Sequence, residues 1–372
     1  MTQHETNPTS EDLQRCQSHL FDDPLDLVSV LSPAYTIMTH AGSGTYGDVY
    51  FCLPSSMIMA ARNHLTAQAD LTVACDDLTK QLVAIKICQG PSLPTLKNEL
   101  AVLQIIATTN HAPTVDTACG STIAHCDAFF LSLDHETSPS GDTHYFTTAT
   151  LPLVCSLDVL LSETQHLPEP FTWLVYVKIR EALTWLMKCC KPGIAHGDLH
   201  PGNILIGYPT LDPRQGQQLP QVKMIDFGNS RIANAETGYA YALLFSQTVH
   251  KDRTAFLHLL ALVVGVMSFD GHVPSRSPSR SPRLGGGESS AEFRQFCRLV
   301  QRAVKRSTWN HGDDLVELES RFKGYAERKL RGLDGEKCKM VWDAVMNGTE
   351  EQREAVRRRV GELVGVVVEG DQ

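Results

Sequence analysis

The segment "HGDLHPGN", residues 196–203, lies between two apolar runs and constrains the fold more than any other stretch of the chain. Its two glycines and its proline exclude the interior of a helix or of a strand, so we predict a loop. The preceding run, residues 171–190, has the length and apolar content of a helix in the centre of a domain. The following run, "ILIGY" at residues 204–208, has the composition of a strand. The polar groups of the loop either face solvent as an ordinary turn or take part in chemistry.

Composition bounds the class of protein. The chain has 372 residues, of which 42% are hydrophobic and 20% are charged, as in folded globular proteins. Its net charge of −9 argues against general nucleic-acid binding, because such binding needs a basic surface. The polar N-terminus lacks the order of a signal peptide, and the longest apolar run, residues 255–269, is too short to span a bilayer. We therefore expect an intracellular protein, cytoplasmic or nuclear, with no membrane span and no nucleic-acid partner.

Periodicity predicts the order of the elements. Residues 95–108 show helical spacing, and residues 293–306 predict an amphipathic helix whose apolar face carries Phe293, Phe296, Val300 and Val304. Residues 1–34 resemble a polar extension, residues 52–78 a loop or insertion, and residues 272–290 a flexible Ser/Arg/Pro/Gly loop. Strand-like patterns occupy residues 36–51, 81–89, 123–133, 143–154, 204–208 and 221–225.

The stretch "GSGTYGDVY", residues 42–50, contains a Gly-x-Gly-x-x-Gly-x-Val pattern. The glycine pattern alone is a weak signal, because the dinucleotide-binding fingerprint shares it. That fingerprint opens a helix, whereas here a β-rich continuation follows, so we predict a glycine-rich hairpin. Glycines let the backbone approach phosphate oxygens closely and donate N–H groups to them.

Four charged or amide side chains further along could handle a phosphate and its metal. Lys86 ends the apolar run "VAIK", and Glu99 lies on the helix predicted over residues 95–108. Each of these two either faces solvent or meets an opposite charge, and the local sequence does not decide between them. Asn203, in the central loop, and Asp226, after the strand at residues 221–225, offer the hard oxygens that Mg²⁺ prefers.

Asp198 gives the central loop a carboxylate of its own. Two carboxylates can divide the work, since one can hold a metal while the other accepts a proton from an attacking hydroxyl. Taken in this order, the glycine loop, V-A-I-K, helix Glu, Asp/Asn loop and D-F-G match the signature set of protein kinases. The sequence therefore resembles the protein-kinase superfamily over residues 42–228.

The resemblance implies an α+β, bilobal fold with a small β-rich N-lobe and a mainly helical C-lobe. The kinase-like domain would span residues 35–372, with the N-lobe over about 35–150 and the C-lobe over about 151–372. The resemblance also implies ATP and Mg²⁺ as cofactors, bound in the cleft between the lobes. By the same analogy, residues 148–154 would form the hinge.

The resemblance assigns roles to matching positions. Asp198 would orient the substrate hydroxyl and accept its proton, Asn203 and Asp226 would hold Mg²⁺, and His196 would brace the loop. Lys86 would bind the α- and β-phosphates while paired with Glu99. The implied nucleotide-binding set is Gly42, Ser43, Gly44, Gly47, Val49, Ala84, Lys86 and Glu99. The implied catalytic set is Asp198, Lys86, Asn203 and His200.

The central loop departs from the commoner H-R-D-L-K-P-E-N of protein kinases. Gly197 stands where many members carry an Arg that pairs with a phosphorylated activation loop, so we expect activity without phosphorylation of residues 226–252. Arg231 could take over the role of that Arg. His200 replaces a Lys that stabilises the transferred phosphoryl group, and it either takes over that role or only fills the loop. The sequence of this loop is similar to that of aminoglycoside- and choline-kinase-like enzymes.

The region after D-F-G lacks both A-P-E and D-x-W-x-x-G. Asp252 is the best replacement for the latter and would anchor the loop at residues 196–203. We expect an ATP- and Mg²⁺-dependent phosphotransferase, with a protein Ser/Thr hydroxyl as acceptor because the glycine pattern is intact. A small-molecule kinase is the alternative, and it is favoured by the sequence of the central loop and by the absence of the A-P-E motif. A pseudokinase scaffold is disfavoured by the presence of Lys86, Glu99, Asp198, Asn203 and Asp226.

Overall fold

The computed structural model of the chain describes residues 34–44, 47–64, 77–89, 92–111, 126–129, 132–137, 143–151, 153–164, 167–208, 219–233, 238–267, 289–306, 311–332 and 339–364. The predicted N-terminal extension and flexible loop lie outside these residues, except for Ala34, Ser289 and Ser290. The chain forms two compact units. Unit 1 comprises Met1–Leu93, Asp134–Thr147 and Val356–Gln372, and unit 2 comprises Pro94–Leu133 and Thr148–Ala355.

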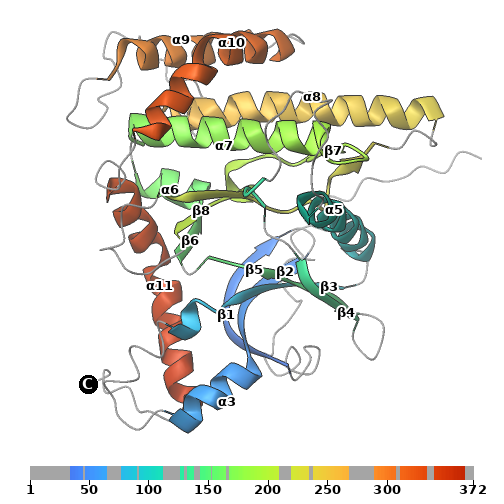
Figure 1. The fold of residues 1–372 in the computed structure, drawn as a ribbon, viewed down its shortest axis with the longest axis vertical. Helices are drawn as coiled ribbons and strands as arrows, with labels where there is room; N and C mark the ends of the chain where they lie inside the picture. The colour runs from blue at the N-terminus through green and yellow to red at the C-terminus, as the bar shows by residue number, and fades with distance from the viewer. Residues whose placement is uncertain are drawn as a thin grey trace, which may run out of the picture. The chain divides into compact units, whose positions relative to one another are not determined.

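Unit 1 is built on a five-stranded sheet (Figure 1). β1 (Tyr35–Gly44) and β2 (Gly47–Pro54) form an antiparallel hairpin, and β3 (Val83–Gln89) pairs with β2. β5 (Thr143–Ala149) and β4 (Ser132–Thr137) complete the sheet in the order β1-β2-β3-β5-β4. The predicted glycine-rich hairpin is therefore confirmed, since Gly44 at the end of β1 pairs with Gly47 at the start of β2.

Two apolar clusters stabilise unit 1. Alternate residues of β3 point to one face of the sheet, where Val83, Ile85 and Ile87 are buried with Tyr50 and Tyr145. The second cluster joins the sheet to α3 (Ser55–His64) and to the end of α11 (Lys339–Val364), and its buried members are Met38, Leu53, Ile58, Leu78, Leu82, Val356 and Val360. Burial of one such aliphatic side chain contributes about 1.5–3 kcal/mol.

Unit 2 is mainly helical. Its helices are α5 (Leu93–His111), α6 (Leu157–Glu163), α7 (Glu169–Lys188), α8 (Gly238–Val263), α9 (Ala291–Lys305), α10 (His311–Arg331) and the first part of α11. A three-stranded sheet has the order β6 (Leu153–Ser156), β8 (Ile204–Tyr208), β9 (Gln221–Met224), and β7 (Ile194–Ala195) pairs with β10 (Arg231–Ile232). Within the described part of the chain, no helix combines the length and the apolar character that a membrane span requires.

Helix α7 carries the core of unit 2, as expected of the apolar run at residues 171–190. The Trp173 ring lies 4.6 Å from Phe296 of α9 and 6.1 Å from Phe322 of α10, between ring centroids. Tyr176 stacks nearly parallel on Phe256 of α8, at 6.2 Å. These aromatic contacts pack the surrounding helices on α7, because aromatic rings bury large areas and prefer such geometries.

The prediction of an α+β, bilobal, kinase-like fold is confirmed by the small β-rich unit and the larger helical one. The predicted lobe boundaries stay predictions. Two local predictions are wrong. Residues 55–64, expected in a loop, form α3, and, in the strand expected over 123–133, residues 126–129 form a turn with one bridge while Ser132 and Leu133 lie in β4. Within 126–129, Phe129 makes an isolated bridge with Met224, and that contact aligns the segment with β9.

Candidate active site

The glycine pattern of unit 1 lies at the end of the β1–β2 hairpin. Gly44 pairs with Gly47, and the Ser43 hydroxyl donates to the Asp48 carboxylate across the hairpin. Gly47 has φ of 148°, and a Cβ on it would overlap the Ile87 carbonyl oxygen. Only glycine fits this position, so the turn depends on it.

The other nucleotide-binding residues predicted in unit 1 share one face of the sheet. Val49 of β2 lies directly opposite Lys86 of β3, and Ala84 lies two residues before Lys86. Opposite and alternate positions of an antiparallel pair point to the same side. All three side chains are half-buried, while Ile85 and Ile87 on the other face belong to the core. A surface of this kind can receive a planar ring and an anion.

In unit 2, the predicted catalytic loop is built around buried His196. Its Nε2–H donates to the Ile225 carbonyl at 3.0 Å, and its Nδ1 accepts from the Asp198 N–H at 3.2 Å. Burial lowers the pKa of His196 to about 4, so the ring is neutral near pH 7. One tautomer satisfies both bonds, and the predicted bracing role of His196 has a direct geometric basis.

Asp252 of α8 anchors the start of this loop. Its carboxylate accepts from the N–H groups of His196 and Gly197, at 2.7 and 2.8 Å, and the residue is only 5% exposed. Burial raises the pKa of Asp252 to about 6, and the two backbone hydrogen bonds oppose that rise. The Lys251 ammonium donates to the Gly197 carbonyl on the same stretch. The anchoring role predicted for Asp252 is confirmed.

Gly197 explains why this loop lacks the arginine of the commoner motif. Its φ of 82° belongs to the left-handed region, and a Cβ on it would overlap the Asn229 carbonyl oxygen. Any larger residue would strain the backbone and displace Asn229. The anchored loop therefore requires glycine at this position.

The two polar residues predicted at the reacting centre contact each other within unit 2. The Asn203 Nδ2 donates to the Asp198 carbonyl at 2.9 Å, and the Asn203 carbonyl accepts from Ile225 N–H at 3.0 Å. The Asn229 Nδ2 donates to Asp198 Oδ2 at 3.1 Å. These bonds orient the Asn203 amide so that its Oδ1 is the atom turned away from Asp198, and Asn229 bonds only one of the two Asp198 carboxylate oxygens.

Asp226 is the one non-glycine residue of the described chain with a positive φ, at 61°. Such a conformation costs about 1–3 kcal/mol and persists where the surroundings enforce it. Helix α5 supplies that enforcement, because Glu99 accepts from the Phe227 N–H at 3.2 Å. Asn98 adds to it, with Nδ2 3.0 Å from the Gly228 carbonyl oxygen. The predicted pairing of Glu99 with Lys86 stays a prediction.

The donor set fits the implied magnesium ion. The amide oxygen of Asn203 and the carboxylate of Asp226 are hard oxygens on segments that the Asn203–Ile225 bond joins. Mg²⁺ typically takes one or two protein ligands of this type and completes its shell with water and phosphate. Among the described residues, no cluster of three or more His, Cys, Asp or Glu side chains forms a separate metal site.

His200 begins the short 3-10 turn at Pro201–Asn203. Its Nδ1 accepts from the Gly202 N–H at 3.1 Å, and its side chain is exposed. This local bond occupies Nδ1 of His200. Its catalytic role stays a prediction.

Three residues that the sequence reasoning missed support the site. Asn98 and Asn229 bond to its backbone and to Asp198, and the buried Ser230 hydroxyl donates to the His196 carbonyl at 2.9 Å. The sequence feature that could have identified them is their position, since Asn98 precedes Glu99 and Asn229 and Ser230 follow D-F-G. Nothing in their residue types alone would have selected them.

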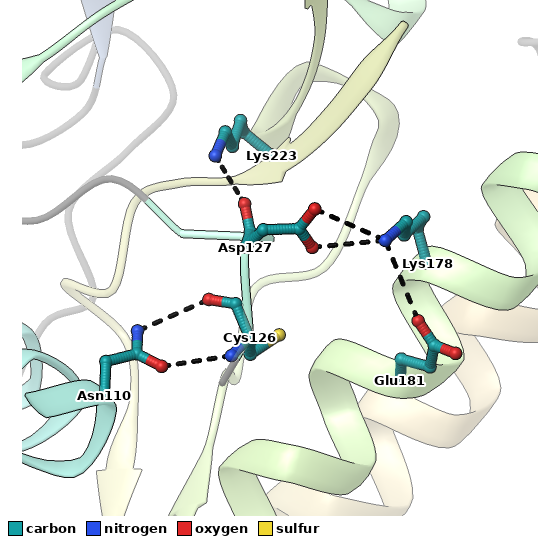
Figure 2. Close-up of polar contacts among 6 residues, drawn as sticks. All are labelled: Asn110, Cys126, Asp127, Lys178, Glu181 and Lys223. Carbon is teal, nitrogen blue, oxygen red and sulfur yellow. Dashed lines mark hydrogen bonds and ion pairs between the residues drawn. The ribbon is translucent and has the colours of Figure 1, made fainter. Parts of the chain in front are cut away.

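A polar cluster outside the catalytic loop holds β9, which leads into the D-F-G segment (Figure 2). Lys223 of β9 is buried, its ammonium donates to the Asp127 carbonyl, and burial lowers its pKa. The Asp127 carboxylate accepts from Lys178 of α7 at 3.2 Å. Asn110 of α5 bonds both backbone groups of Cys126, at 3.0 and 3.3 Å. These contacts tie residues 126–129 to α5, α7 and β9.

The anchored Asp/Asn loop, the strained aspartate of D-F-G and the glycine hairpin define the chain as a protein-kinase-like protein. A family model described as the ABC1 atypical kinase-like domain matches residues 176–260, from α7 through the catalytic loop into α8. This match supports the protein-kinase-like superfamily, whose domain generally implies the use of ATP and Mg²⁺. No curated protein matches the chain.

Proposed function

We propose that the protein is an ATP- and Mg²⁺-dependent phosphotransferase that transfers the γ-phosphoryl group to a substrate hydroxyl. The observation that supports this most is the orientation of Asp198, whose Oδ2 is held by Asn229 while its carbonyl is held by Asn203. The second carboxylate oxygen is thereby available to accept the proton of the attacking hydroxyl. Phosphoryl transfer asks mainly for such positioning and for charge neutralisation.

The remaining residues divide between metal and nucleotide. Asn203 and Asp226 would hold Mg²⁺, which supplies charge neutralisation to the transferred group when it is bound. In unit 1, Val49 and Ala84 would contact the adenine ring, and Lys86, on the same face, would bind phosphate oxygens. The backbone N–H groups of the glycine hairpin would cover the phosphates.

Two acceptors remain in the proposal. The complete glycine pattern on a β-hairpin supports the Ser/Thr hydroxyl of a protein, as expected from the sequence. The start of α8 at Gly238, soon after Asp226, supports a small-molecule hydroxyl. The reason is that protein kinases use a longer segment after D-F-G to bind a peptide. The intracellular location, cytoplasmic or nuclear, is also part of the proposal.

The test is label transfer from γ-labelled ATP by the purified full chain, supplied in parallel with a protein array and a metabolite pool. Label on Ser or Thr of proteins identifies the first acceptor, and label on a metabolite identifies the second. Asp198→Asn should abolish either transfer, while Asp77→Asn, at an exposed ion pair with Lys80, should not change it. Equal transfer by Asp198→Asn and by the parent chain would refute the proposal. Nucleotide binding without any transfer would favour a pseudokinase scaffold.

A further inference from the structure

The first turns of α8 expose an apolar surface. Residues 238–249 have the sequence GYAYALLFSQTV, which contains no charged side chain, and Val249 is the first buried residue of the helix. Tyr239 is 85% exposed, Leu243 is 46% exposed and Leu244 is 47% exposed. In Figure 1, this end of α8 extends past the end of α7. Exposed apolar side chains that gather in one patch, unlike single ones, mark surfaces that bind a partner.

This apolar surface adjoins the predicted catalytic loop within unit 2. Thr248 lies against Gly197, since its Cγ2 would be 3.3 Å from a Cβ placed on that glycine. The Lys251 ammonium donates to the Gly197 carbonyl. Leu244, Thr248 and Lys251 follow one another at spacings of four and three residues, so they share one side of α8. Leu244 therefore continues, one turn further out, the side of α8 that contacts the loop.

Helix geometry gives the distances along this surface. Leu244 precedes Thr248 by four residues and Tyr239 precedes it by nine, which correspond to about 6 Å and about 14 Å along an α-helix. In an extended peptide, side chains on one face are about 7 Å apart, because every second residue points the same way. Asp198 is only half-buried. A peptide whose Ser or Thr lies at Asp198 can therefore place apolar side chains, two to four positions away, on Leu244 and Tyr239.

Two exposed cations lie beside the loop. Arg231 is exposed on β10, directly opposite Ala195, and it forms no ion pair with the described residues. Lys251 is also exposed, and its contact with the loop is to a carbonyl rather than to a carboxylate. An acidic residue next to the acceptor hydroxyl would complement these two cations, whereas a basic residue there would be repelled.

We propose that the start of α8 is the docking surface for the acceptor, and that the acceptor is a segment of a protein. Apolar residues of this segment lie two to four positions from its Ser or Thr, and an acidic residue lies beside it. The inference rests on the proposed phosphotransferase function and chooses between its two acceptors. A small molecule would bury little of its surface on a convex helix, whereas an extended peptide can follow α8 from Thr248 to Tyr239. The short segment between Asp226 and Gly238 is then sufficient, because α8 itself supplies the peptide-binding surface.

The test uses the purified full chain and matched synthetic peptides, each with one serine and one glutamate next to it. One peptide carries leucines two and four positions before the serine, a second carries them after it, and a control carries glutamines in their place. One leucine peptide should have a kcat/KM at least about tenfold above that of the control. The gain should come mainly from a lower KM, because docking contacts bind substrate and transition state alike. Fluorescence anisotropy of labelled peptides without ATP should give the same order of affinities.

Two exposed leucines provide the variant, and an exposed methionine provides its control. In the double variant Leu243→Gln and Leu244→Gln, the ratio of kcat/KM between the leucine and control peptides should fall below about twofold. Tyr239→Ser is an independent second variant, and it should lower the ratio at least about threefold. Met59→Gln, at a position 66% exposed on α3 of unit 1, should leave the ratio unchanged. All these side chains are exposed, so the unfolding temperatures should stay at that of the parent.

The outcomes separate this inference from the proposed function. Equal transfer to leucine and control peptides, or an unchanged ratio in both variants, would overturn the inference and leave the phosphotransferase standing. Preferential binding that the double variant abolishes, without transfer to any peptide, would support the docking surface and refute the proposed transfer. The parent chain is also sedimented alone and with phosphatidylcholine vesicles. If the double variant loses a dimer or vesicle binding, and no peptide preference exists, the patch belongs to a second copy or to a lipid surface and the inference is overturned.

Discussion

The predicted catalytic loop of unit 2 (residues 196–203) and the glycine hairpin of unit 1 are both short glycine-containing segments, and they are held in different ways. The loop is held by distant side chains, with Asp252 of α8 on its N–H groups and Ser230 on a carbonyl. The hairpin is held by the pairing of its own strands and by the local contact between Ser43 and Asp48. The loop is buried at His196 and Gly197, whereas the hairpin is exposed at Ser43.

This difference separates two ways in which a sequence specifies a site. In the hairpin, most residues are specified by strand pairing and by their neighbours in the chain, and Gly47, which lies against the Ile87 carbonyl of β3, is the exception. In the loop, the surroundings decide, because Gly197 faces the Asn229 carbonyl and Asp252 faces two N–H groups. The same chemical change should therefore cost more in the loop region than in the hairpin.

The largest difference is expected between Asp226→Asn, in the loop region, and Asp48→Asn, in the hairpin. Asp226→Asn removes the charge that we propose binds Mg²⁺, so phosphoryl transfer should fall about a thousandfold, or about 4 kcal/mol in the barrier. Asp48→Asn keeps an oxygen that can accept from Ser43, so its rate should stay within about threefold of the parent. Steady-state rates with Mg²⁺-ATP measure both. A parent-like rate for Asp226→Asn would show that the metal site is misassigned.

Two glycine substitutions, one in the loop and one in the hairpin, test the same comparison through the free energy of unfolding. Gly197→Ala combines a left-handed backbone with an overlap, and it should lower the free energy of unfolding by about 3 kcal/mol. In Gly42→Ala, the new Cβ would have no atom within 4 Å, so the change should be below about 1 kcal/mol. Urea denaturation of both variants gives the two values. Equal losses would mean that the loop is not held as described.

Asp252→Asn should produce a smaller loss. The amide keeps one acceptor oxygen but turns an NH₂ group toward the second buried N–H, which costs about 2 kcal/mol. Part of the loss is offset, because the buried carboxylate no longer has to be desolvated. The control Asp77→Asn, at an exposed ion pair, should cost less than about 0.5 kcal/mol. Chemical denaturation at neutral pH compares them, and identical midpoints would argue against the anchor.

The parts of the fold that the sequence predicted correctly are those with a strong local pattern. The apolar run at residues 171–190 became α7, and residues 293–306 fall almost entirely within α9, with Phe293 and Phe296 buried. The glycine hairpin followed from glycines next to β-rich residues. Asp252 was found by its position after D-F-G, which the kinase resemblance made meaningful.

The predictions that failed concern elements held by contacts between residues far apart in the sequence. Helix α3 was missed because its apolar residues, 57–61, are consecutive and show no helical spacing, and Ile58 packs in one cluster with Val356 and Val360 from the other end of the chain. The residues that hold the candidate site in place were not predicted for the same reason. Asn98 donates to carbonyls about 130 positions away in the sequence, and no local sequence pattern predicts such a bond.

The smallest effect is expected from phosphorylation after D-F-G. Gly197 offers no guanidinium to a phosphate, and its fixed conformation excludes an arginine there. Ser230 is buried and bonded, whereas Tyr239, in the first turn of α8, is 85% exposed. Activity should therefore change less than twofold after phosphatase treatment. The same should hold for a variant with Tyr239→Phe and Tyr241→Phe.

Arg231 is the competing phosphate partner, because it is exposed and lies next to Ser230. If it replaced the missing arginine, dephosphorylation would cost tenfold or more, or about 1.4 kcal/mol in the barrier, and rephosphorylation would restore the rate. Arg231→Ala would then reproduce the loss and abolish the response to phosphatase. If the loop is held by Asp252 and Ser230 alone, Arg231→Ala and the parent chain will have the same rate before and after treatment. The catalytic loop would then be independent of the exposed start of α8, just as its buried contacts indicate.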